Sequence, residues 1–473
     1  MLARNQIGFA MLFCAVAATS LAAQTFTTLA SFNLNDGYFP TGSLVQGLDG
    51  NFYGVAELAG AGPGFGSIFR VTPQGTLTRV HRFHGPEGSL PGAGLVLAMN
   101  GDLYGTTGYG GSGFGNVFAL TAQGTVFSLY AFDGADGSGP GALVQTPDGN
   151  FYGTTVAGGH CNLGTVFRMT PQGVVRTLRS FRGYGSGPGR QLVQGSDGYF
   201  YGTTFDGGSS TSCGSSGCGT IFKISPDGLT LKFLHSFNGP DGTNPSGNMV
   251  LGADGNLYGT AAYGGLFNST CFLGCGTVFK ITPQGTFTTI HVFDGTDGQE
   301  VSAGLMQATD GNLYGAAAVG GNSACPLVGC GTVFQITPDG AFTILHSFAG
   351  PDGESPEGEL LQGTDGNLYG TTLEGGANHC EFHTCGTVFS ISMGLGPFVR
   401  TVPTAKKVGL CVRILGTDLT GAAAVTFNGM PATFTIVSPT EITATVPKGA
   451  TTGKVQVTTP SGILSSNVDF QVL

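Results

Sequence analysis

Apolar and polar residues alternate over short stretches along most of the chain, and turn residues separate these stretches. Residues 303–348 show the pattern clearly, because two tight turns, TDGN and TPDG, divide them and glycine accepts the positive φ that such turns need. Period-two alternation predicts β-strands. The four strands predicted in this stretch are AGLMQA (303–308), NLYGAA (312–317), GTVFQI (331–336) and AFTILHSF (341–348).

The same pattern recurs along the chain. The string Asp-Gly-Asn-Leu/Phe-Tyr-Gly, or a close variant, occurs seven times with its tyrosines 48 to 57 residues apart, and a string Gly-x-Val/Ile-Phe keeps step with it. Units of four antiparallel strands at this period predict the blades of a β-propeller. The tyrosines are Tyr53, Tyr104, Tyr152, Tyr201, Tyr258, Tyr314 and Tyr369, and the phenylalanines are Phe69, Phe118, Phe167, Phe222, Phe279, Phe334 and Phe389.

The seventh unit lacks its fourth strand, because the chain after Phe389 runs into a different kind of sequence. The N-terminal segment TFTTLASF (25–32) closely matches TFTTIHVF (286–293), a fourth strand of an earlier unit. We therefore expect an all-β fold, a seven-bladed β-propeller closed by the N-terminal strand, which covers an exposed sheet edge. The alternative is an open solenoid with one stray strand, but its terminal edges would lack polar caps.

The recurrent pattern LVQGxDGNxYGTT…GTVFxITPxG…F resembles the Gloeo/Verruco tandem repeat of exported bacterial proteins, over residues 25 to about 392. The resemblance implies secretion and often a cell-surface location, but no settled activity. We assign residues 24–392 to the repeats and residues 393–396 to a linker.

Residues 397–473 alternate with period two between closely spaced turn signals, which predicts a small immunoglobulin-like β-sandwich. The segment resembles the IPT/TIG domain, and this resemblance implies a spacer or an interaction module. The positions that match are Gly416, Phe427, Gly429, Ile442, Val446, Pro447, Gly453, Val455 and Val457.

Residues 1–23 are predicted to be a signal peptide, with Arg4, an apolar core and small residues before the expected cleavage point. No later apolar run has membrane length, so we expect a protein that is secreted, extracellular or periplasmic, with no membrane span. Glycine is 85 of 473 residues and charged residues are 10%, a composition that favours short strands joined by turns over helices.

Charge divides along the predicted domain boundary. Residues 24–392 carry 11 Lys and Arg against 25 Asp and Glu, a net charge of −14, whereas residues 397–473 carry 6 against 3, a net of +3. An acidic repeat region argues against nucleic acid, because neutralising phosphates supplies most of that affinity. Neutral polar or cationic ligands such as glycans are compatible with this charge.

Paired cysteines occupy the same predicted loop in four successive units, and four local disulfides are predicted: Cys213–Cys218, Cys271–Cys275, Cys325–Cys330 and Cys380–Cys385. The alternative is a metal site at HCEFHTC (379–385), where His379 and His383 accompany two cysteines. We favour disulfides and predict neither a metal nor a cofactor, because an exported protein oxidises paired thiols. Cys161 and Cys411 have no assigned partner.

One position, five residues after each repeat tyrosine, changes from unit to unit, and loops that vary on a rigid scaffold are where binding usually occurs. It reads Leu58, Tyr109, Ala157, Asp206, Tyr263, Val319 and Glu374. Stacking faces and hydrogen-bond acceptors suit a sugar, so we predict that Tyr109, Asp206, Tyr263 and Glu374 bind ligand. The alternative is that these are solvated loop residues without a ligand.

Two further patterns are interpreted as scaffold. His81, His235, His291 and His346 each stand two residues before a strand-ending phenylalanine, which favours packing or hydrogen bonding over catalysis. The FxGxDGxxP loops offer one or two carboxylates each, too few for the six to eight oxygens of a calcium site, so turns are favoured.

The sequence therefore favours an exported, monomeric binding or cell-surface interaction protein without catalytic residues, whose partner is an extracellular glycan or a cell-surface protein. The alternative is a propeller-type polysaccharide lyase or hydrolase. That alternative needs a non-repeating cluster of acid and base near the central mouth. Within the variable position, Asp206 and Glu374 are the only such pair.

Overall fold

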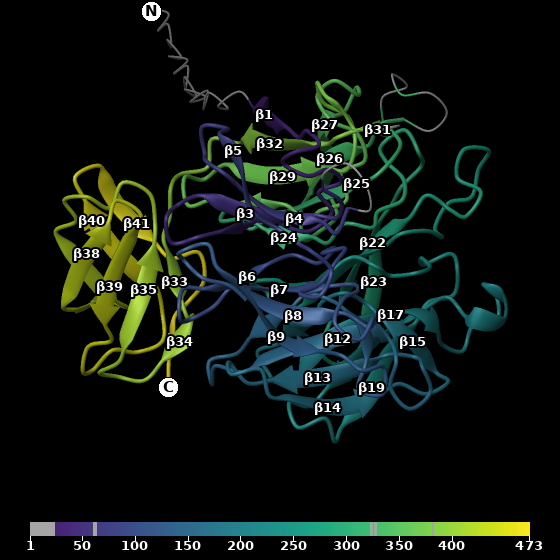
Figure 1. The fold of residues 1–473 in the computed structure, drawn as a ribbon, viewed down its shortest axis with the longest axis horizontal. Helices are drawn as coiled ribbons and strands as arrows, with labels where there is room; N and C mark the ends of the chain where they lie inside the picture. The colour runs from purple at the N-terminus through teal and green to yellow at the C-terminus, as the bar shows by residue number, and fades with distance from the viewer. Residues whose placement is uncertain (1–23, 60–63, 322–324, 326–328, 381–382) are drawn as a thin grey trace, which may run out of the picture.

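The structure is a computed structural model of the 473-residue chain, and it describes residues 24–59, 64–321, 325, 329–380 and 383–473. The predicted signal peptide, residues 1–23, lies outside the described residues. The described chain is almost wholly β: it has one 3-10 turn, η1 (Gly214–Ser216), and none of its helices is long and apolar enough to span a membrane. Small sheets follow one another along the chain, and the C-terminal residues (yellow) lie beside them (Figure 1).

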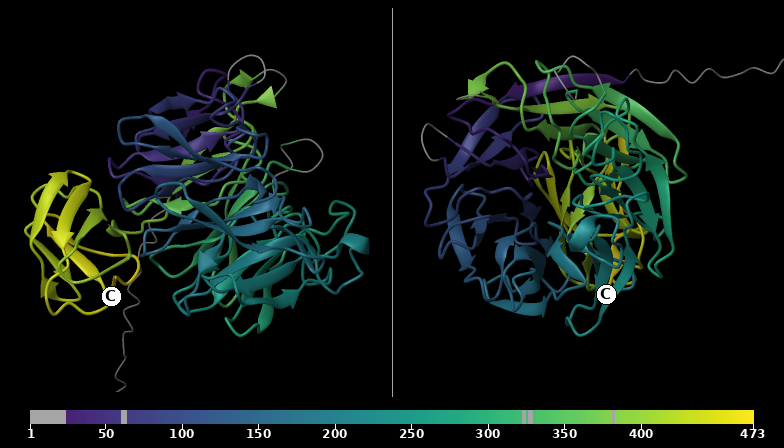
Figure 2. Two further views of the ribbon diagram at one scale, coloured as in Figure 1. Left: turned by 60° about the horizontal axis from the view of Figure 1, so that its bottom comes forward. Right: turned by 90° about the vertical axis from the view of Figure 1, so that its right-hand side faces the viewer.

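Residues 25–392 form seven antiparallel sheets of four or five strands, numbered here one to seven, arranged around a common centre (Figure 2), and a two-stranded sheet of β30 (His379–Cys380) and β31 (His383–Thr384). Sheets three and four have five strands each. In sheet three two short strands pair with β12, and in sheet four two other short strands pair with β17. The strands are β2 (Val45–Gln46), β3 (Phe52–Ala56), β4 (Ser67–Val71) and β5 (Leu77–Arg82); β6 (Val96–Leu97), β7 (Leu103–Thr107), β8 (Asn116–Leu120) and β9 (Val126–Ala131); β10 (Ser138–Pro140), β11 (Val144–Gln145), β12 (Phe151–Ala157), β13 (Thr165–Met169) and β14 (Val175–Ser180); β15 (Gly185–Pro188), β16 (Val193–Gln194), β17 (Phe200–Gly207), β18 (Thr220–Ile224) and β19 (Leu231–Ser236); β20 (Val250–Leu251), β21 (Leu257–Ala261), β22 (Thr277–Ile281) and β23 (Phe287–Val292); β24 (Met306–Gln307), β25 (Leu313–Ala317), β26 (Thr332–Ile336) and β27 (Phe342–Ser347); and β28 (Leu361–Gln362), β29 (Leu368–Thr372), β32 (Thr387–Ser392) and β1 (Thr25–Ser31).

The repeated strings are explained by one turn and one close contact, seen well in sheet five. The Asp254 carboxylate accepts hydrogen bonds from the backbone N–H of Asn256 at 3.1 Å and from the Tyr258 hydroxyl at 2.7 Å, so it closes the turn and fixes the tyrosine. Gly259 follows, and a Cβ there would stand 2.6 Å from the ring of Phe279 on the next strand. The glycine of the first string therefore leaves room for the phenylalanine ring of the second string, and a larger residue at that position would collide with the ring.

In sheet seven the N-terminal strand β1 pairs antiparallel with β32. The ring of Phe26 on β1 stacks on His346 of sheet six, with ring centroids 3.6 Å apart. Phe342 of sheet six makes the same contact with His291 of sheet five at 4.0 Å. The N-terminal strand thus makes the packing contact that an outer strand makes elsewhere.

Neighbouring sheets are linked by glutamine side chains. Gln362 of sheet seven accepts a hydrogen bond from the backbone N–H of Thr309 in sheet six at 3.0 Å. Gln46 of sheet one accepts one from the backbone N–H of Thr364 in sheet seven, also at 3.0 Å. Sheets one and seven, at opposite ends of the repeat region, therefore contact each other as consecutive sheets do.

The four repeat histidines bond to the loops that follow them. In sheet five, His291 Nε2 lies 2.8 Å from the Asp297 carboxylate, which also accepts the backbone N–H of Asp294 at 2.9 Å. The carboxylate of the FxGxDG loop is therefore engaged in holding its own loop against the sheet. The corresponding pairs are His81–Glu87, His235–Asp241 and His346–Asp352.

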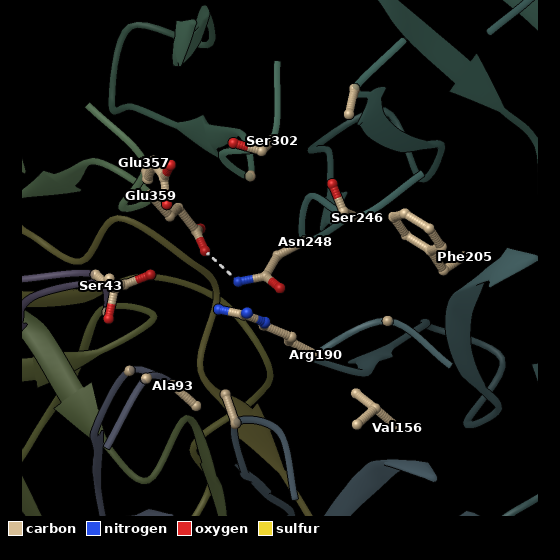
Figure 3. Close-up of a pocket in the computed structure, with 18 of the residues that line it drawn as sticks. Ser43, Ala93, Val156, Arg190, Phe205, Ser246, Asn248, Ser302, Glu357 and Glu359 are labelled. Atoms are coloured by element: carbon tan, nitrogen blue, oxygen red, sulfur yellow. Dashed lines mark hydrogen bonds between the residues drawn. The ribbon is translucent and has the colours of Figure 1, made fainter. Parts of the chain in front are cut away.

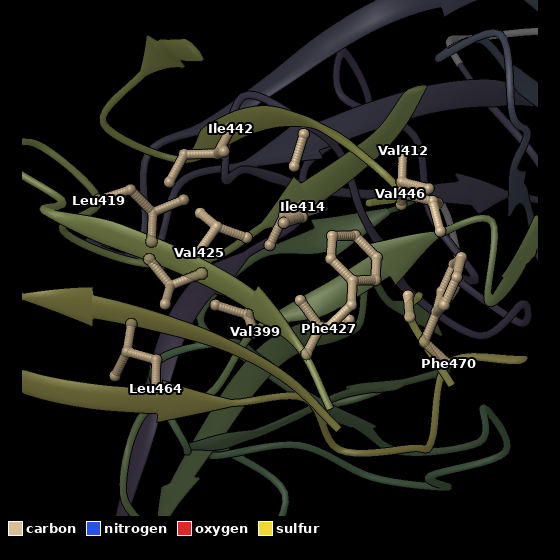
Figure 4. Close-up of a cluster of buried hydrophobic side chains, with 14 residues drawn as sticks. Val399, Val412, Ile414, Leu419, Val425, Phe427, Ile442, Val446, Leu464 and Phe470 are labelled. Carbon is tan, nitrogen blue, oxygen red and sulfur yellow. The ribbon is translucent and has the colours of Figure 1, made fainter. Parts of the chain in front are cut away.

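The C-terminal residues form a separate β-structure with its own core. Two four-stranded sheets enclose a cluster of buried side chains, in which the rings of Phe427 and Phe470 meet edge to face at 5.0 Å (Figure 4). A parallel pair joins the first strands to the last. The strands are β33 (Arg400–Val402), β35 (Cys411–Leu415), β39 (Glu441–Thr445) and β38 (Phe434–Ser438); β37 (Met430–Pro431), β36 (Ala424–Phe427), β40 (Val455–Thr459) and β41 (Gly462–Ser465); and the pair β34 (Ala405–Lys406) and β42 (Gln471–Val472).

Candidate functional site

The centre of the seven sheets is lined by the short segments that lead into the first strand of each sheet or, in sheets three and four, into β11 and β16. Each begins with proline, or Val301 in sheet six, and ends with leucine, or Met249 in sheet five. Left-handed backbone precedes them, for example at Glu300 with φ of 55°. The residues between these ends differ from sheet to sheet. The segments are 40–44, 91–95, 140–143, 188–192, 245–249, 301–305 and 356–360.

These segments enclose a cavity of about 510 Å³, which we call the central cavity (Figure 3). Much of its wall is glycine, alanine and serine, so a few longer side chains decide its chemistry. Phe205 and Val156 add apolar surface. The polar side chains in the wall belong to Thr41, Ser43, Arg190, Asp206, Ser246, Asn248, Tyr263, Glu300, Ser302, Glu357 and Glu359.

Two of these side chains meet near the middle of the cavity, and two more lie close to them. Asn248 of sheet five donates a hydrogen bond from Nδ2 to Glu359 of sheet seven at 3.0 Å. Arg190 extends from sheet four toward the same place, and Glu357 lies beside Glu359 (Figure 3). Because these groups come from different sheets, no single repeat unit could assemble the site.

Burial in the cavity raises the pKa of the Glu359 and Glu357 carboxyl groups. Glu359 is half-buried, and its burial raises the pKa to about 7, against the opposing effect of the Asn248 hydrogen bond. Burial likewise raises the pKa of Glu357, where Arg190 opposes the shift and the Glu300 carboxylate adds to it. Glu359 can therefore hold a proton near neutral pH, because the charged form of a buried carboxyl group is disfavoured.

Tyr263 and Asp206 complete the acidic side of the cavity. Burial raises the pKa of Tyr263, and the neighbouring Glu300 carboxylate raises it further. Burial also raises the pKa of Asp206. The wall therefore offers acceptors for hydroxyl or ammonium groups, a guanidinium donor at Arg190, and two aromatic rings, those of Phe205 and Tyr263.

The four predicted ligand residues are not brought together. Asp206 and Tyr263 line the central cavity, whereas Tyr109 and Glu374 are not part of its wall. Tyr109 is 58% exposed, and the Oε1 atom of Glu374 lies 3.3 Å from Nδ1 of His383.

Sequence reasoning missed Arg190, Asn248, Glu357 and Glu359, which lie before the first strands and not after the second. The signal was present. When the units are aligned on the segment that leads into the first strand, the residue before its final leucine or methionine changes widely. It reads Ser43, Gly94, Ala142, Gln191, Asn248, Gly304 and Glu359.

The cysteine-bearing loops are cross-linked locally. The structure contains disulfides between Cys213 and Cys218, Cys271 and Cys275, Cys325 and Cys330, and Cys380 and Cys385. Cys161 and Cys411 are exposed and unpaired. At 379–385 two cysteines of the suggested metal site are bonded to each other, and in the part of the chain that the structure describes no three His, Cys, Asp or Glu residues are grouped to hold a metal ion.

Family models match nearly the whole chain. The Gloeobacter/Verrucomicrobia repeat matches residues 15–213 and 208–402, and the IPT/TIG domain matches residues 401–472. No curated protein sequence matches the chain.

Two solved structures are similar at low sequence identity. A fungal alcohol oxidase of the AA5 family, solved in complex with copper, matches 95% of this chain and 98% of its own at 14% identity, with a TM-score of 0.52. The extracellular domain of a protein described as a one-component system from B. thetaiotaomicron matches 95% of this chain and 58% of its own at 11% identity, with a TM-score of 0.51. At these identities the likeness concerns the fold.

Proposed function

The chain belongs to the Gloeobacter/Verrucomicrobia repeat family and carries a C-terminal IPT/TIG domain, and on this premise we propose that it is an exported, non-catalytic interaction protein. The repeats form a ligand platform, the central cavity is the binding site, and the IPT/TIG domain is a spacer or contact module. One observation carries the proposal: seven similar sheets present different side chains at one place, from Gly304 to Glu359. If the centre had only a structural role, the same residues would be expected there in every sheet, as with the repeat tyrosines and phenylalanines.

On this proposal the seven sheets are the blades of one β-propeller, and β1 closes it. The ring contact between Phe52 of sheet one and Tyr369 of sheet seven, at 3.9 Å, supports closure, because Tyr152 and Phe200 of consecutive sheets make the same contact at 4.3 Å. A single chain then supplies the whole ring, so a monomer suffices. Residues 24–392 are the propeller, 393–396 the linker and 397–473 the β-sandwich.

The ligand is a neutral or cationic polar molecule, such as the end of an extracellular glycan. Support comes from the carboxyl oxygens of Asp206, Glu300 and Glu357, which can accept hydrogen bonds from hydroxyl or ammonium groups, and from Tyr263, whose ring can stack on a sugar face. Export is supported by the four disulfides, which persist in oxidising compartments, and by the predicted leader at residues 1–23.

A second candidate, a polysaccharide lyase or hydrolase, is favoured by one observation. The raised pKa of Glu359, about 7, suits a general acid or base at neutral pH, and Arg190 lies nearby to stabilise developing negative charge. We place it second because binding alone explains the same residues.

A glycan array probed with the purified, exported protein tests the proposal, followed by an activity assay on every glycan that is retained. Retention without turnover is expected. Retention with turnover would replace the binding function by the enzymatic one, and no retention of any neutral or amino-bearing glycan would contradict the glycan as ligand.

Two tyrosines from the same repeat position locate the site. Tyr263→Ala should weaken binding of the retained ligand by about tenfold or more, because Tyr263 lines the central cavity. Tyr109→Ala is the matched control and should leave the affinity unchanged, because Tyr109 is exposed away from that wall. If Tyr109→Ala weakened binding and Tyr263→Ala did not, the ligand would bind at the loop around Tyr109 and not in the central cavity.

A further inference from the structure

A second cavity, of about 410 Å³, lies between the repeats and the IPT/TIG domain, and we call it the interdomain pocket. Its walls include β2, β6 and β11 from sheets one to three and residues 400–404 and 467–468 from the C-terminal domain. The central cavity touches residues 41–43, just before β2, so the two cavities follow each other along the same strands.

Direct hydrogen bonds hold the IPT/TIG domain over this end of the repeats. Arg400 donates from Nη2 to the carbonyl oxygen of Gln362 at 3.1 Å. Thr440 donates its hydroxyl to the Leu48 carbonyl at 2.7 Å. The interdomain pocket is therefore a product of specific docking between the two domains.

The pocket contains polar groups that the protein leaves unsatisfied. The Thr401 side chain is 2% exposed, and its hydroxyl has no hydrogen-bond partner among the described residues. The amide oxygen of Asn467, also in the wall, is buried and likewise unpartnered. Buried polar atoms almost always have a partner. Of these two atoms only the Thr401 hydroxyl can donate, so an acceptor on a bound molecule would complete it, whereas the Asn467 oxygen is itself an acceptor.

Arg400 adds a positive charge to these groups. It is half-buried in the pocket wall, and burial lowers its pKa with no carboxylate acting to raise it. A cation in such a place gains from an anion that can pair with its guanidinium. Most of the remaining wall is apolar, including Leu97, Val144 and Val468.

We propose that the interdomain pocket binds a small carboxylate with an apolar body. The carboxylate pairs with the Arg400 guanidinium and accepts the Thr401 hydroxyl proton in a hydrogen bond, while the apolar body lies against Leu97 and Val144. The ligand thereby bridges the two domains. Guanidinium and carboxylate match in geometry and charge, and the apolar wall excludes strongly hydrated anions such as phosphate.

Calorimetric titration of the full exported chain with benzoate tests this. We expect saturable binding at one site, with benzamide and inorganic phosphate at least tenfold weaker. Arg400→Met should weaken benzoate binding at least tenfold and Thr401→Val by a smaller factor. Arg182→Met removes an exposed charge elsewhere and should leave the benzoate affinity unchanged.

Methyl NMR on the unmodified protein provides a readout that needs no variant. Benzoate should shift the methyl resonances of Leu97 and Val144, which both line the pocket. Absence of a saturable shift would overturn the proposal and leave the pocket to water alone. Phosphate binding as tightly as benzoate, or benzoate binding unaffected by Arg400→Met, would also overturn it.

Discussion

Among single residues, Glu359 connects the central cavity to the stability of the fold. Its carboxyl has an ordinary pKa of 4.5, which burial raises to about 7. The folded state therefore binds a proton between pH 4.5 and 7 that the unfolded state has released, so this group makes stability fall as the pH rises through that range. Below pH 4.5 both states are protonated and the residue contributes no pH dependence.

Glu359→Gln should remove this loss of stability. Glutamine keeps an acceptor for Asn248 without a charge to desolvate, so at pH 8 the variant should unfold with a free energy about 1 to 3 kcal/mol higher than the parent protein. Below pH 4.5 the two should converge. Urea unfolding at pH 4, 6 and 8 measures both effects. Asp339→Asn, at an exposed position, is the control, and equal pH dependence in parent and Glu359→Gln proteins would contradict the account.

At this scale the sequence pointed to part of the wall of the central cavity. The variable position pointed to Asp206 and Tyr263, which line the central cavity, and equally to Tyr109 and Glu374, which do not. The reason is physical: a side chain reaches the centre only where its sheet directs it there, and period-two alternation does not define that direction. Asn248 and Glu359 meet across 111 positions of sequence, a contact that no local pattern encodes.

Among the elements, β1 brings the N-terminal end of the repeats to their C-terminal end. It pairs with β32 from the other end of the repeats, and Phe26 stacks on His346 and meets Phe348 and Phe389 edge to face or face to face. Much of this could be predicted, because the seventh unit lacks a fourth strand and TFTTLASF repeats the sequence of one. The stacking on His346 could not, since it joins neighbouring sheets.

Phe26→Ala should destabilise the protein by about 2 to 4 kcal/mol, because it removes a large side chain from a packed aromatic cluster. Phe127→Ala on β9 is the matched control: that ring is 49% exposed, and its loss should cost less than about 1 kcal/mol. Guanidinium unfolding followed by near-ultraviolet circular dichroism measures the difference. Equal effects would mean that β1 is not an integral strand of sheet seven.

At the scale of the whole molecule, the IPT/TIG domain is docked on the repeats by direct hydrogen bonds. The domain bonds to sheets one and seven through Thr440 and Arg400 and covers apolar side chains such as Leu97. The sequence predicted two domains and their opposite charges, but not this contact, because a linker of four residues is compatible with docked and free arrangements alike.

A chain that ends at residue 396 lacks the IPT/TIG domain, so apolar side chains of the repeats that line the interdomain pocket should become exposed to solvent. Compared with the full chain, it is expected to bind more of a hydrophobic dye such as anilinonaphthalene sulfonate and to unfold at lower denaturant concentration. Identical dye binding and an identical midpoint would mean that the domain is only tethered to the repeats.

The central claim is that the central cavity is where this protein holds its ligand. A crystal structure with the glycan retained on the array tests it most directly. The account predicts ligand density inside the cavity, in contact with Asn248, Glu359 and Tyr263. Density confined to the loop tips around Tyr109, with an empty cavity, would contradict it.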